Sequence, residues 1–263
     1  MCRWVAYAGP EIYLEDILFN QSNSIASQSY SAKESVWTTN GDGFGVAWYT
    51  QRTTAGLFKD VLPAWNDNNL RSLAAHIRTH LFFAHVRATT GSSISRANCH
   101  PFIWKNWTFM HNGQIGGWKT CRKEYESHIS HDYFSLRDGS TDSEAIFLLA
   151  LSLGLPDNPI KAITQAIEIA LQTMDKHQIQ EPLRASIAVS DGLSIWAFRY
   201  SNDANSPSLY FGNPETQANT SNNLITTIAS EPLDAEAQHW HKVEEASAIV
   251  WNAAAVEQHA IRI

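Results

Sequence analysis

A cysteine stands at position 2 of this 263-residue chain, directly after the initiator methionine. If Met1 is removed, which the small side chain of Cys2 permits, this cysteine carries the free α-amine. An α-amine has a pKa of about 7.7–8.0 and can act as a general base near neutral pH. Cys2 would then hold a nucleophile and its base in one residue, which predicts catalysis without a separate histidine. The alternative is a small buried hydrophobic residue, as most lone cysteines are.

Three further segments carry groups that acyl transfer would need. Arg87 follows an apolar stretch and can grip a substrate carboxylate through two parallel hydrogen bonds. Asn112 offers a side-chain amide to an oxyanion, and Gly113 lets its backbone N–H approach the same oxygen closely. Asp142, at the start of an expected helix, can pair with a substrate ammonium. With Cys2, these residues predict an amino-acid site beside a nucleophile.

Each of these residues also has an ordinary structural interpretation. Asn112-Gly113 is a common hairpin-turn sequence. The segment Thr141–Glu144 has the spacing of a capping box, in which Asp142 would only favour the helix dipole. Arg87 could form a structural ion pair. Taken singly, these interpretations are the better ones, but they do not explain why all the groups occur together with Cys2.

In this combination the chain resembles the class II glutamine amidotransferases, N-terminal-nucleophile hydrolases that begin with a cysteine. The resemblance covers nearly the whole chain and rests on five segments: Met1-Cys2, residues 40–45 (NGDGFG), His85-Val86-Arg87, His111-Asn112-Gly113 and Thr141-Asp142-Ser143-Glu144. It implies an α+β fold, the four-layer αββα sandwich. It also implies one domain over residues 1–263, with the mature chain beginning at Cys2.

The resemblance further implies a role for each site residue. Cys2 would be the nucleophile, and Asn112 with Gly113 would form the oxyanion hole. Arg87 would bind the α-carboxylate of the substrate and Asp142 its α-amine. His111 would be a further substrate-binding residue.

Two more segments resemble a narrower, stand-alone subgroup: residues 98–102 (NCHPF) and 229–233 (ASEPL). This subgroup includes the γ-glutamyl hydrolase of ergothioneine biosynthesis and the amidotransferase-like subunit of glutathione degradation. Family members often carry threonine where Cys99 stands, so we assign Cys99 no catalytic role. The sequence assigns no role to His100 or Glu231.

We therefore expect a cysteine-dependent amidohydrolase that cleaves the γ-glutamyl amide bond of glutamine or another small γ-glutamyl compound through a thioester at Cys2. Two alternatives stay open: an ammonia-supplying glutaminase subunit of a separate synthase, and a catalytically silent binding module. An acylase for apolar acyl chains is disfavoured, because Arg87 and Asp142 suit an amino-acid head group. A synthase or hydrolase partner, the oligomeric state and the group beyond the γ-amide are left undetermined. No cofactor is implied.

The elements that must position these residues follow from hydrophobic periodicity and turn signals. The middle of the chain predicts two helices, one after the cap at Thr141 and one opened by Asn158-Pro159. We also expect helices over 11–19 and 70–77, and a loop over 22–35. Strands are expected over residues 4–8, 43–50, 81–88, 107–110, 185–190, 193–200, 209–212, 224–229, 248–251 and 260–263.

Composition excludes several classes of partner. The net charge of −7 argues against nucleic acid and anionic membranes, which require clustered Lys and Arg. The longest apolar run, residues 145–155, falls short of the ~20 residues that a membrane span needs. With no secretory signal and an odd number of cysteines, we expect a cytoplasmic protein. His76 and His80 have helical spacing, but with no third ligand evident we expect no metal site.

Overall fold

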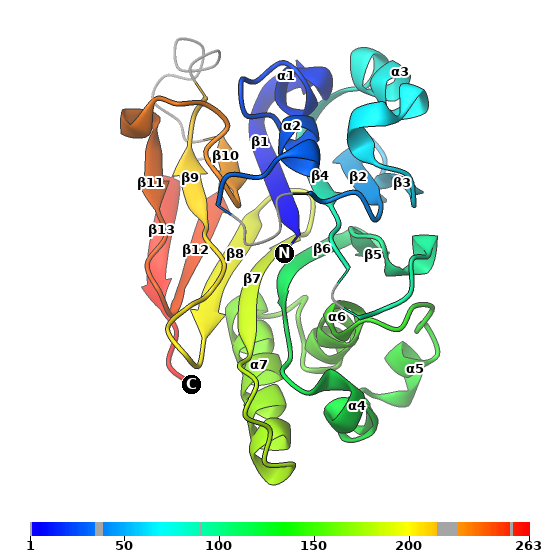
Figure 1. The fold of residues 1–263 in the computed structure, drawn as a ribbon, viewed down its shortest axis with the longest axis vertical. Coiled ribbons are helices and arrows are strands. Elements are labelled where there is room, and N and C mark those ends of the chain that lie inside the picture. The colour runs from blue at the N-terminus through cyan, green and yellow to red at the C-terminus, as the bar shows by residue number, and fades with distance from the viewer. Residues whose placement is uncertain (1, 35–38, 90, 215–225, 253–254) are drawn as a thin grey trace.

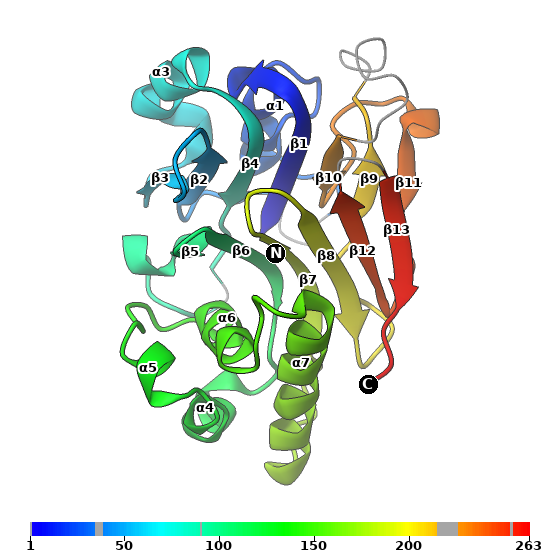
Figure 2. The same cartoon turned by 180° about the vertical axis from the view of Figure 1, so that it is seen from behind.

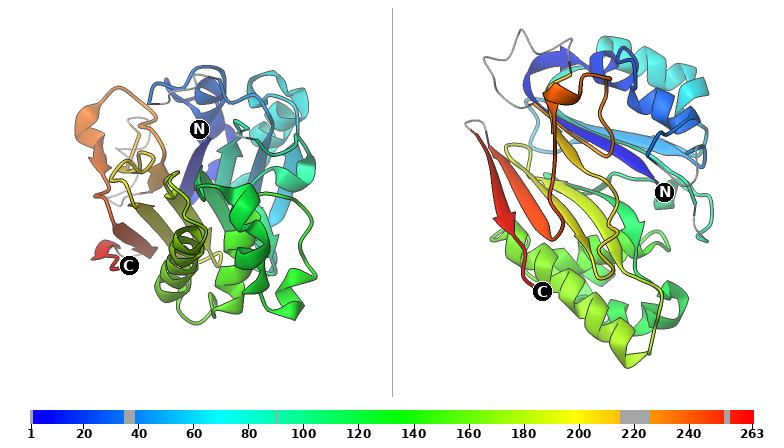
Figure 3. Two further views of the ribbon diagram at one scale, coloured as in Figure 1. Left: turned by 60° about the horizontal axis from the view of Figure 1, so that its bottom comes forward. Right: turned by 60° about the vertical axis from the view of Figure 1, so that its left-hand side comes forward.

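The computed structural model describes residues 2–34, 39–89, 91–214, 226–252 and 255–263. Over these residues the strands form two sheets, in which every pair of neighbouring strands is antiparallel. The sheets stack face to face, and helices cover the outer face of each (Figures 1 and 3). The expected four-layer αββα sandwich is thereby confirmed.

The first sheet has seven strands and contains the N-terminal strand near its middle. In spatial order it runs β11 (Trp240–Lys242), β9 (Tyr210–Gly212), β10 (Thr227–Ala229), β1 (Arg3–Tyr13), β4 (Arg78–Val86), β2 (Phe44–Tyr49) and β3 (Gly56–Asp60). Three helices lie on its outer face: α1 (Glu15–Leu18), α2 (Ile25–Tyr30) and α3 (Asn68–His76). Short 3₁₀ turns occur at Ala64–Asn66 and Ala237–His239.

The second sheet has six strands and carries the longer helices. Its order is β13 (Ala255–Ala260), β12 (Ser247–Asn252), β8 (Ile195–Ser201), β7 (Arg184–Ser190), β6 (Trp107–Gln114) and β5 (Phe102–Trp104). The helices on its outer face are α4 (Trp118–Ser127), α5 (His131–Phe134), α6 (Asp142–Ser152) and α7 (Pro159–Lys176) (Figure 2). In the described residues no helix is long and apolar enough to cross a membrane.

Side-chain alternation along the strands produces three apolar layers. On β1, Val5 and Tyr7 face the outer helices, whereas Trp4 and Ala6 face the other sheet. The inner layer between the sheets also includes Met110 of β6. The outer layer under α6 and α7 is the largest, and α6 is buried almost all round. This alternation decides which polar side chains can meet between the sheets.

Most expected elements are present, and the two central helices begin at their expected caps. Thr141 Oγ1 accepts a hydrogen bond from the backbone N–H of Glu144 at 3.2 Å. The Glu144 carboxylate, however, accepts from the N–H groups of Asp138 and Gly139, so the reciprocal half of the capping box is absent. Asn158 caps α7 by accepting from the N–H of Lys161 at 3.1 Å.

Several local expectations were wrong. The expected helix over 11–19 is shorter, because β1 continues to Tyr13 and leaves only α1. The expected loop over 22–35 contains α2, whose start is capped by Ser24 and whose Ile25 is buried in the outer layer. Near the C-terminus the observed strand is β13, which ends at Ala260. The sequence predicted a strand that begins there and covers residues 260–263. Part of the strand expected over 224–229 falls outside the described residues.

Candidate active site

Three of the predicted residues come to one end of the space between the sheets. β1 and β4 are antiparallel and Arg3 pairs with Val86, so Cys2 and Arg87 extend from neighbouring strand ends. Both continue the inward-facing positions of their strands, which Trp4 and Phe83 occupy in the inner layer. Asn112 continues the inward-facing row of β6 that contains Met110.

A tryptophan connects the nucleophile strand to the strand next to Asn112. The indole N–H of Trp4 donates to the carbonyl oxygen of Ser186 on β7 at 3.2 Å. Ser186 is the direct cross-strand partner of Asn112. In Figures 1 and 2 the start of β1 accordingly lies beside β6. The first sheet therefore brings Cys2 to the inner face of the second sheet near Asn112.

Cys2 itself is half-buried, and its Sγ lies 3.6 Å from the carbonyl oxygen of Ala88. Burial is the main cause that raises the pKa of its thiol, although nearby Arg87 and Arg3 act in the opposite direction. Such a thiol is mostly protonated at neutral pH and would need a base to become a nucleophile.

The backbone at Cys2 is held by a buried ion pair that the sequence did not reveal. The Arg3 guanidinium points to the outer side of β1, where its Nε lies 2.5 Å from the Glu231 carboxylate. Its Nη1 donates to the carbonyl oxygen of Cys2 at 2.9 Å. Glu231 also accepts from the N–H groups of Lys33 and Glu34 at 3.0 and 2.9 Å. Glu231 thus anchors both Cys2 and the segment that passes beside it.

The Asn112 amide is buried, yet neither its nitrogen nor its oxygen has a hydrogen-bond partner within the described part of the chain. The hydroxyl of Ser186, opposite Asn112, is also buried, and it too lacks a partner in the described ranges. Unsatisfied buried polar groups are rare because each costs about 1–3 kcal/mol. The amide of Asn112 and the hydroxyl of Ser186 lie on paired residues, as we expect where a polar atom of a ligand binds. Sequence reasoning missed Ser186, although its strand alternation would have placed it on the inner face.

Asn112-Gly113 lies inside β6, so the hairpin-turn interpretation is wrong. Position 113 requires glycine because the backbone of β7 lies very close to it. A Cβ on Gly113 would lie 1.8 Å from the carbonyl oxygen of Arg184. Only glycine therefore allows the two strands to approach this closely beside Asn112.

His111 lies on the other face of β6. Its buried ring contacts α6, where Nδ1 lies 2.8 Å from the Ser143 hydroxyl. Its Nε2 lies 3.4 Å from the carbonyl oxygen of Arg184. The structure thus places His111 away from the inner face that carries Asn112, between β6 and the start of α6.

Asp142 is the first residue of α6 and is partly exposed. Its carboxylate accepts from the N–H groups of Ile115 and Ser143, each at 2.8 Å. It lines a cavity of about 530 Å³ together with Gly91, Ser92, Ser93, Gln114, Ile115, Gly117, Trp118, Lys119, Thr120, Arg122, Ser140, Thr141 and Glu181. The Asp142 carboxylate therefore faces a space large enough for a small molecule.

Arg87 is buried, and its guanidinium donates hydrogen bonds to Ser92 and Ser93, two residues that line this cavity. Its Nη2 donates to the hydroxyl of Ser92 at 2.7 Å and to the carbonyl oxygen of Ser93 at 3.2 Å. Its Nη1 donates to the carbonyl oxygen of Asp42 at 3.4 Å. Among the described residues no carboxylate lies within ion-pair distance of Arg87. A buried cation without a counter-ion favours an anionic ligand, because burying an unpaired charge is costly.

The Asp42 carboxylate accepts from the backbone N–H and the hydroxyl of Thr89, both at 2.7 Å. This contact ties the NGDGFG segment to the chain that follows Arg87. The segment therefore helps to position the residues that follow Arg87.

Two buried histidines pack against each other behind the site. The rings of His85 and His100 stack with centroids 4.2 Å apart. Burial lowers the pKa of His85 to about 3 and that of His100 well below its usual range, so both are neutral. Neither ring nitrogen of His100 has a hydrogen-bond partner in the described residues. The sequence assigned no role to His100, and the structure shows its ring stacked on His85.

The other two cysteines are buried, and the histidine pair considered in the sequence does not share a helix. Cys99 and Cys121 are buried thiols, and Cys99 Sγ contacts the carbonyl oxygens of Asp60 and Ser95. His76 ends α3 whereas His80 lies in β4, so the expected shared helical face was wrong. No group of three metal-ligating side chains occurs among the residues described.

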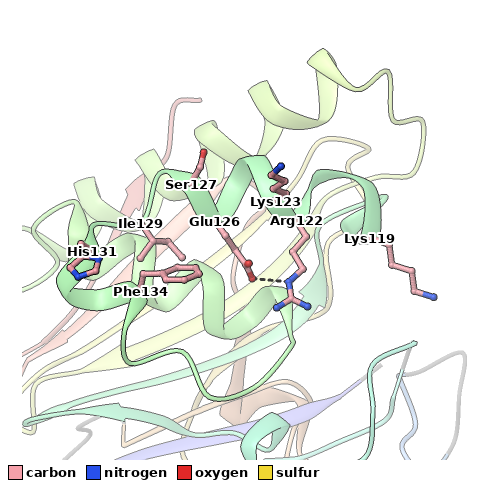
Figure 4. A pocket seen from close by; sticks show the side chains of 8 residues that line it. All are labelled: Lys119, Arg122, Lys123, Glu126, Ser127, Ile129, His131 and Phe134. Atoms are coloured by element: carbon pink, nitrogen blue, oxygen red, sulfur yellow. Dashed lines mark hydrogen bonds and ion pairs between the residues drawn. The ribbon is translucent and has the colours of Figure 1, made fainter.

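A second cavity of about 530 Å³ lies on the outer side of the helical layer at α4 and α5 (Figure 4). Its lining consists of Lys119, Arg122, Lys123, Glu126, Ser127, Ile129, His131 and Phe134. It shares Lys119 and Arg122 with the Asp142 cavity. None of the predicted site residues lines it, and we place no chemistry there.

The fold agrees with what comparison with known proteins shows. The sequence matches the family model of class II glutamine amidotransferases over residues 17–206. The chain therefore belongs to the class II glutamine amidotransferases, a family of amidohydrolases with the N-terminal-nucleophile fold.

Individual relatives agree with this assignment. The chain is 34% identical to the probable glutamine amidotransferase DUG3 of Saccharomyces cerevisiae, over 92% of this chain and 79% of the yeast protein. It is 30% identical to the gamma-glutamyl-hercynylcysteine sulfoxide hydrolase of Mycolicibacterium smegmatis, over 44% of this chain and 52% of that protein.

Solved structures show the same fold. A glutamine aminotransferase class-II domain protein from Silicibacter pomeroyi superimposes with a TM-score of 0.76 at 34% identity, and all of each chain is covered. The glutamine phosphoribosylpyrophosphate amidotransferase of B. subtilis has a TM-score of 0.64 at 12% identity, over all of this chain and 50% of that one. At that identity the second likeness concerns the fold alone.

Proposed function

We propose that the chain, after removal of Met1, hydrolyses the γ-glutamyl amide bond of glutamine or of a larger γ-glutamyl compound through a thioester at Cys2. One observation carries the proposal most directly. Within the described parts of the chain the buried amide of Asn112 has no hydrogen-bond partner, and it lies on the inner face toward which Cys2 points. This is the arrangement that an acyl-transfer site requires of an oxyanion donor.

The first step would be proton transfer within Cys2. Because burial raises the pKa of the thiol, little thiolate forms unaided at neutral pH. The free α-amine of Cys2, with a pKa of about 7.7–8.0, would accept the thiol proton. The thiolate then attacks the γ-carbonyl carbon, and the carbonyl electron pair moves onto the oxygen. Asn112 Nδ2 and the backbone N–H of Gly113 would donate to that oxyanion.

Collapse of the tetrahedral adduct breaks the carbon–nitrogen bond. The leaving amine or ammonia takes the proton from the α-ammonium of Cys2, which leaves a γ-glutamyl thioester. Water then attacks the thioester carbonyl while the α-amine accepts a water proton. Cleavage of the carbon–sulfur bond releases glutamate, and the proton returns to the thiol.

The head group of the substrate would bind between Arg87 and Asp142. The guanidinium of Arg87 lacks a carboxylate partner in the described chain and would take the α-carboxylate. The Asp142 carboxylate already accepts two backbone N–H groups and faces the cavity with lone pairs to spare, so it would take the α-ammonium. His111, held between β6 and α6, would support this arrangement without touching the substrate.

The substrate class can be tested with a panel that contains glutamine, γ-glutamyl peptides and α-glutamyl controls. We expect glutamate release from γ-glutamyl compounds only, and none from the Cys2→Ala variant. A preference for a bulky γ-glutamyl compound would support a stand-alone hydrolase, whereas glutamine alone would support an ammonia-supplying subunit. Release from α-glutamyl compounds at the same rate would contradict the proposal.

A further inference from the structure

Asn98 is a buried asparagine at the end of the 3₁₀ turn Arg96–Asn98, and it contrasts with Asn112. Whereas the amide of Asn112 has no partner among the residues that the structure describes, both polar atoms of the Asn98 amide are hydrogen-bonded. The functional assignment above gives Asn98 no role. Its hydrogen bonds nevertheless run to the two segments that carry the proposed head-group ligands.

The amide nitrogen of Asn98 donates hydrogen bonds to the loop that follows Arg87. Its Nδ2 lies 2.8 Å from the carbonyl oxygen of Ser93 and 3.1 Å from the Ser93 hydroxyl. The same carbonyl oxygen accepts from Nη2 of Arg87 at 3.2 Å. One backbone oxygen thus joins the amide of Asn98 to the guanidinium that would bind the α-carboxylate.

The amide oxygen of Asn98 accepts a hydrogen bond from the segment that leads into α6. Its Oδ1 accepts from the backbone N–H of Ser140 at 2.8 Å, two residues before Asp142. Gly139 lies directly against this contact, since a Cβ there would be 2.5 Å from the same oxygen. The carboxylate of Glu144 fixes the other side of the segment by accepting from the N–H groups of Asp138 and Gly139 at 2.9 and 2.8 Å.

We propose that Asn98 is a positioning residue that sets the separation between Arg87 and Asp142, and thereby selects substrates with both an α-carboxylate and an α-ammonium. This inference rests on the proposed function. The link needs a donor at one end of the side chain and an acceptor at the other, which a carboxamide supplies and a carboxylate does not. Ser93 and Ser140 both line the Asp142 cavity, so a shift of either wall changes that cavity directly.

The test compares two reagents that alkylate Cys2. Diazo-oxo-norleucine carries an amino-acid head group, whereas iodoacetamide does not. In Asn98→Asp we expect labelling by diazo-oxo-norleucine to slow by about tenfold or more, because small misplacements of binding groups carry large rate penalties. Labelling by iodoacetamide should stay at the wild-type rate. The KM for glutamine should rise by about tenfold while kcat changes by less than about threefold.

A matched control and a second variant keep the test decisive. Asn106→Asp makes the same change at a half-buried asparagine between β5 and β6, one that donates to the carbonyl oxygen of Asp191 at 2.9 Å, and should leave both labelling rates unchanged. If Asn98→Asp does not fold, Gly139→Ala pushes the same contact apart while Asn98 is kept, and should show the same split between the two reagents.

Two results would overturn the inference in distinguishable ways. A wild-type rate with diazo-oxo-norleucine in both Asn98→Asp and Gly139→Ala, or an equal loss with both reagents, would overturn the positioning role alone. If the wild-type chain is labelled by iodoacetamide but not by diazo-oxo-norleucine, the proposed function fails and the inference fails with it.

Discussion

The ring of His85 on β4 lies 3.2 Å from the backbone carbonyl oxygen of His111 on β6, and this hydrogen bond joins the two sheets one residue before Asn112. Because a carbonyl oxygen only accepts, Nε2 of His85 carries the proton. The ring is neutral, since burial lowers its pKa to about 3. His85 thereby fixes the peptide unit from which Asn112 extends.

Replacing His85 should consequently impair the oxyanion hole more than substrate binding. We expect His85→Leu, which loses the donor, to lower kcat by about 10- to 100-fold with a small change in KM. His85→Gln can still donate to the His111 carbonyl and should retain more activity than His85→Leu. Steady-state kinetics on glutamine would measure this, and equal losses in both variants would argue against the hydrogen bond as the cause.

Stability should decrease as the solution becomes acidic. Burial is the main cause that lowers the pKa values of His85, His100 and His111, so the unfolded chain binds more protons than the folded one below about pH 6.5. The histidine contribution is complete above that pH and is lost as the pH falls toward the folded-state values. For His85 alone, the loss between pH 7 and pH 5 is about 2 kcal/mol.

Urea unfolding at pH 7 and pH 5 would measure this dependence. His85→Gln removes one titrating group and should flatten the change with pH. The same pH slope in His85→Gln and in the wild type would contradict a contribution from this residue.

The buried pair of Arg3 and Glu231 predicts an asymmetric response to mutation. Glu231→Ala leaves the Arg3 cation buried without its counter-ion and should cost about 3–5 kcal/mol of unfolding free energy. The double variant Arg3→Met with Glu231→Leu removes both charges and should recover part of that loss. Urea denaturation of the wild type, Glu231→Ala and the double variant measures the pattern, and a double variant at least as unstable as Glu231→Ala would contradict it.

We expect substitution of Asn112 to lower activity without lowering stability. Because its amide has no partner, Asn112→Leu removes a buried polar group without breaking any hydrogen bond observed in the described residues. We expect the melting temperature to stay the same or to rise while kcat falls by about 10²–10³-fold. A loss of stability as large as that of an ordinary buried polar deletion would show that Asn112 is structural.

The sequence predicted the two central helices and most of the longer strands, because these depend on local periodicity and caps, but it missed β3, β5 and β11. The cap at Thr141 and the alternation of β4 and β6 are examples, and they also place Arg87 and Asn112. The expected loop over 22–35 was wrong for a physical reason. Its polar serines lowered helix propensity, but burial of Ile25 against the first sheet stabilises α2.

What the sequence could not provide were contacts between residues far apart in the chain. Arg3 and Glu231 are 228 positions apart, and nothing near either residue indicates the other. The expectation that His111 binds the substrate came from the family resemblance and not from its place in a strand. Neighbouring residues of one strand face opposite sides, so His111 and Asn112 cannot both face Cys2.

The proposed reaction depends most on the α-amine of Cys2, which acts as the base. The direct test compares the chain with a free N-terminal Cys2 and the chain with a short extension before Cys2, each verified by intact mass. We predict glutamate release and a γ-glutamyl thioester adduct for the free Cys2 chain, and neither for the extended chain. Full turnover by the extended chain would contradict the account.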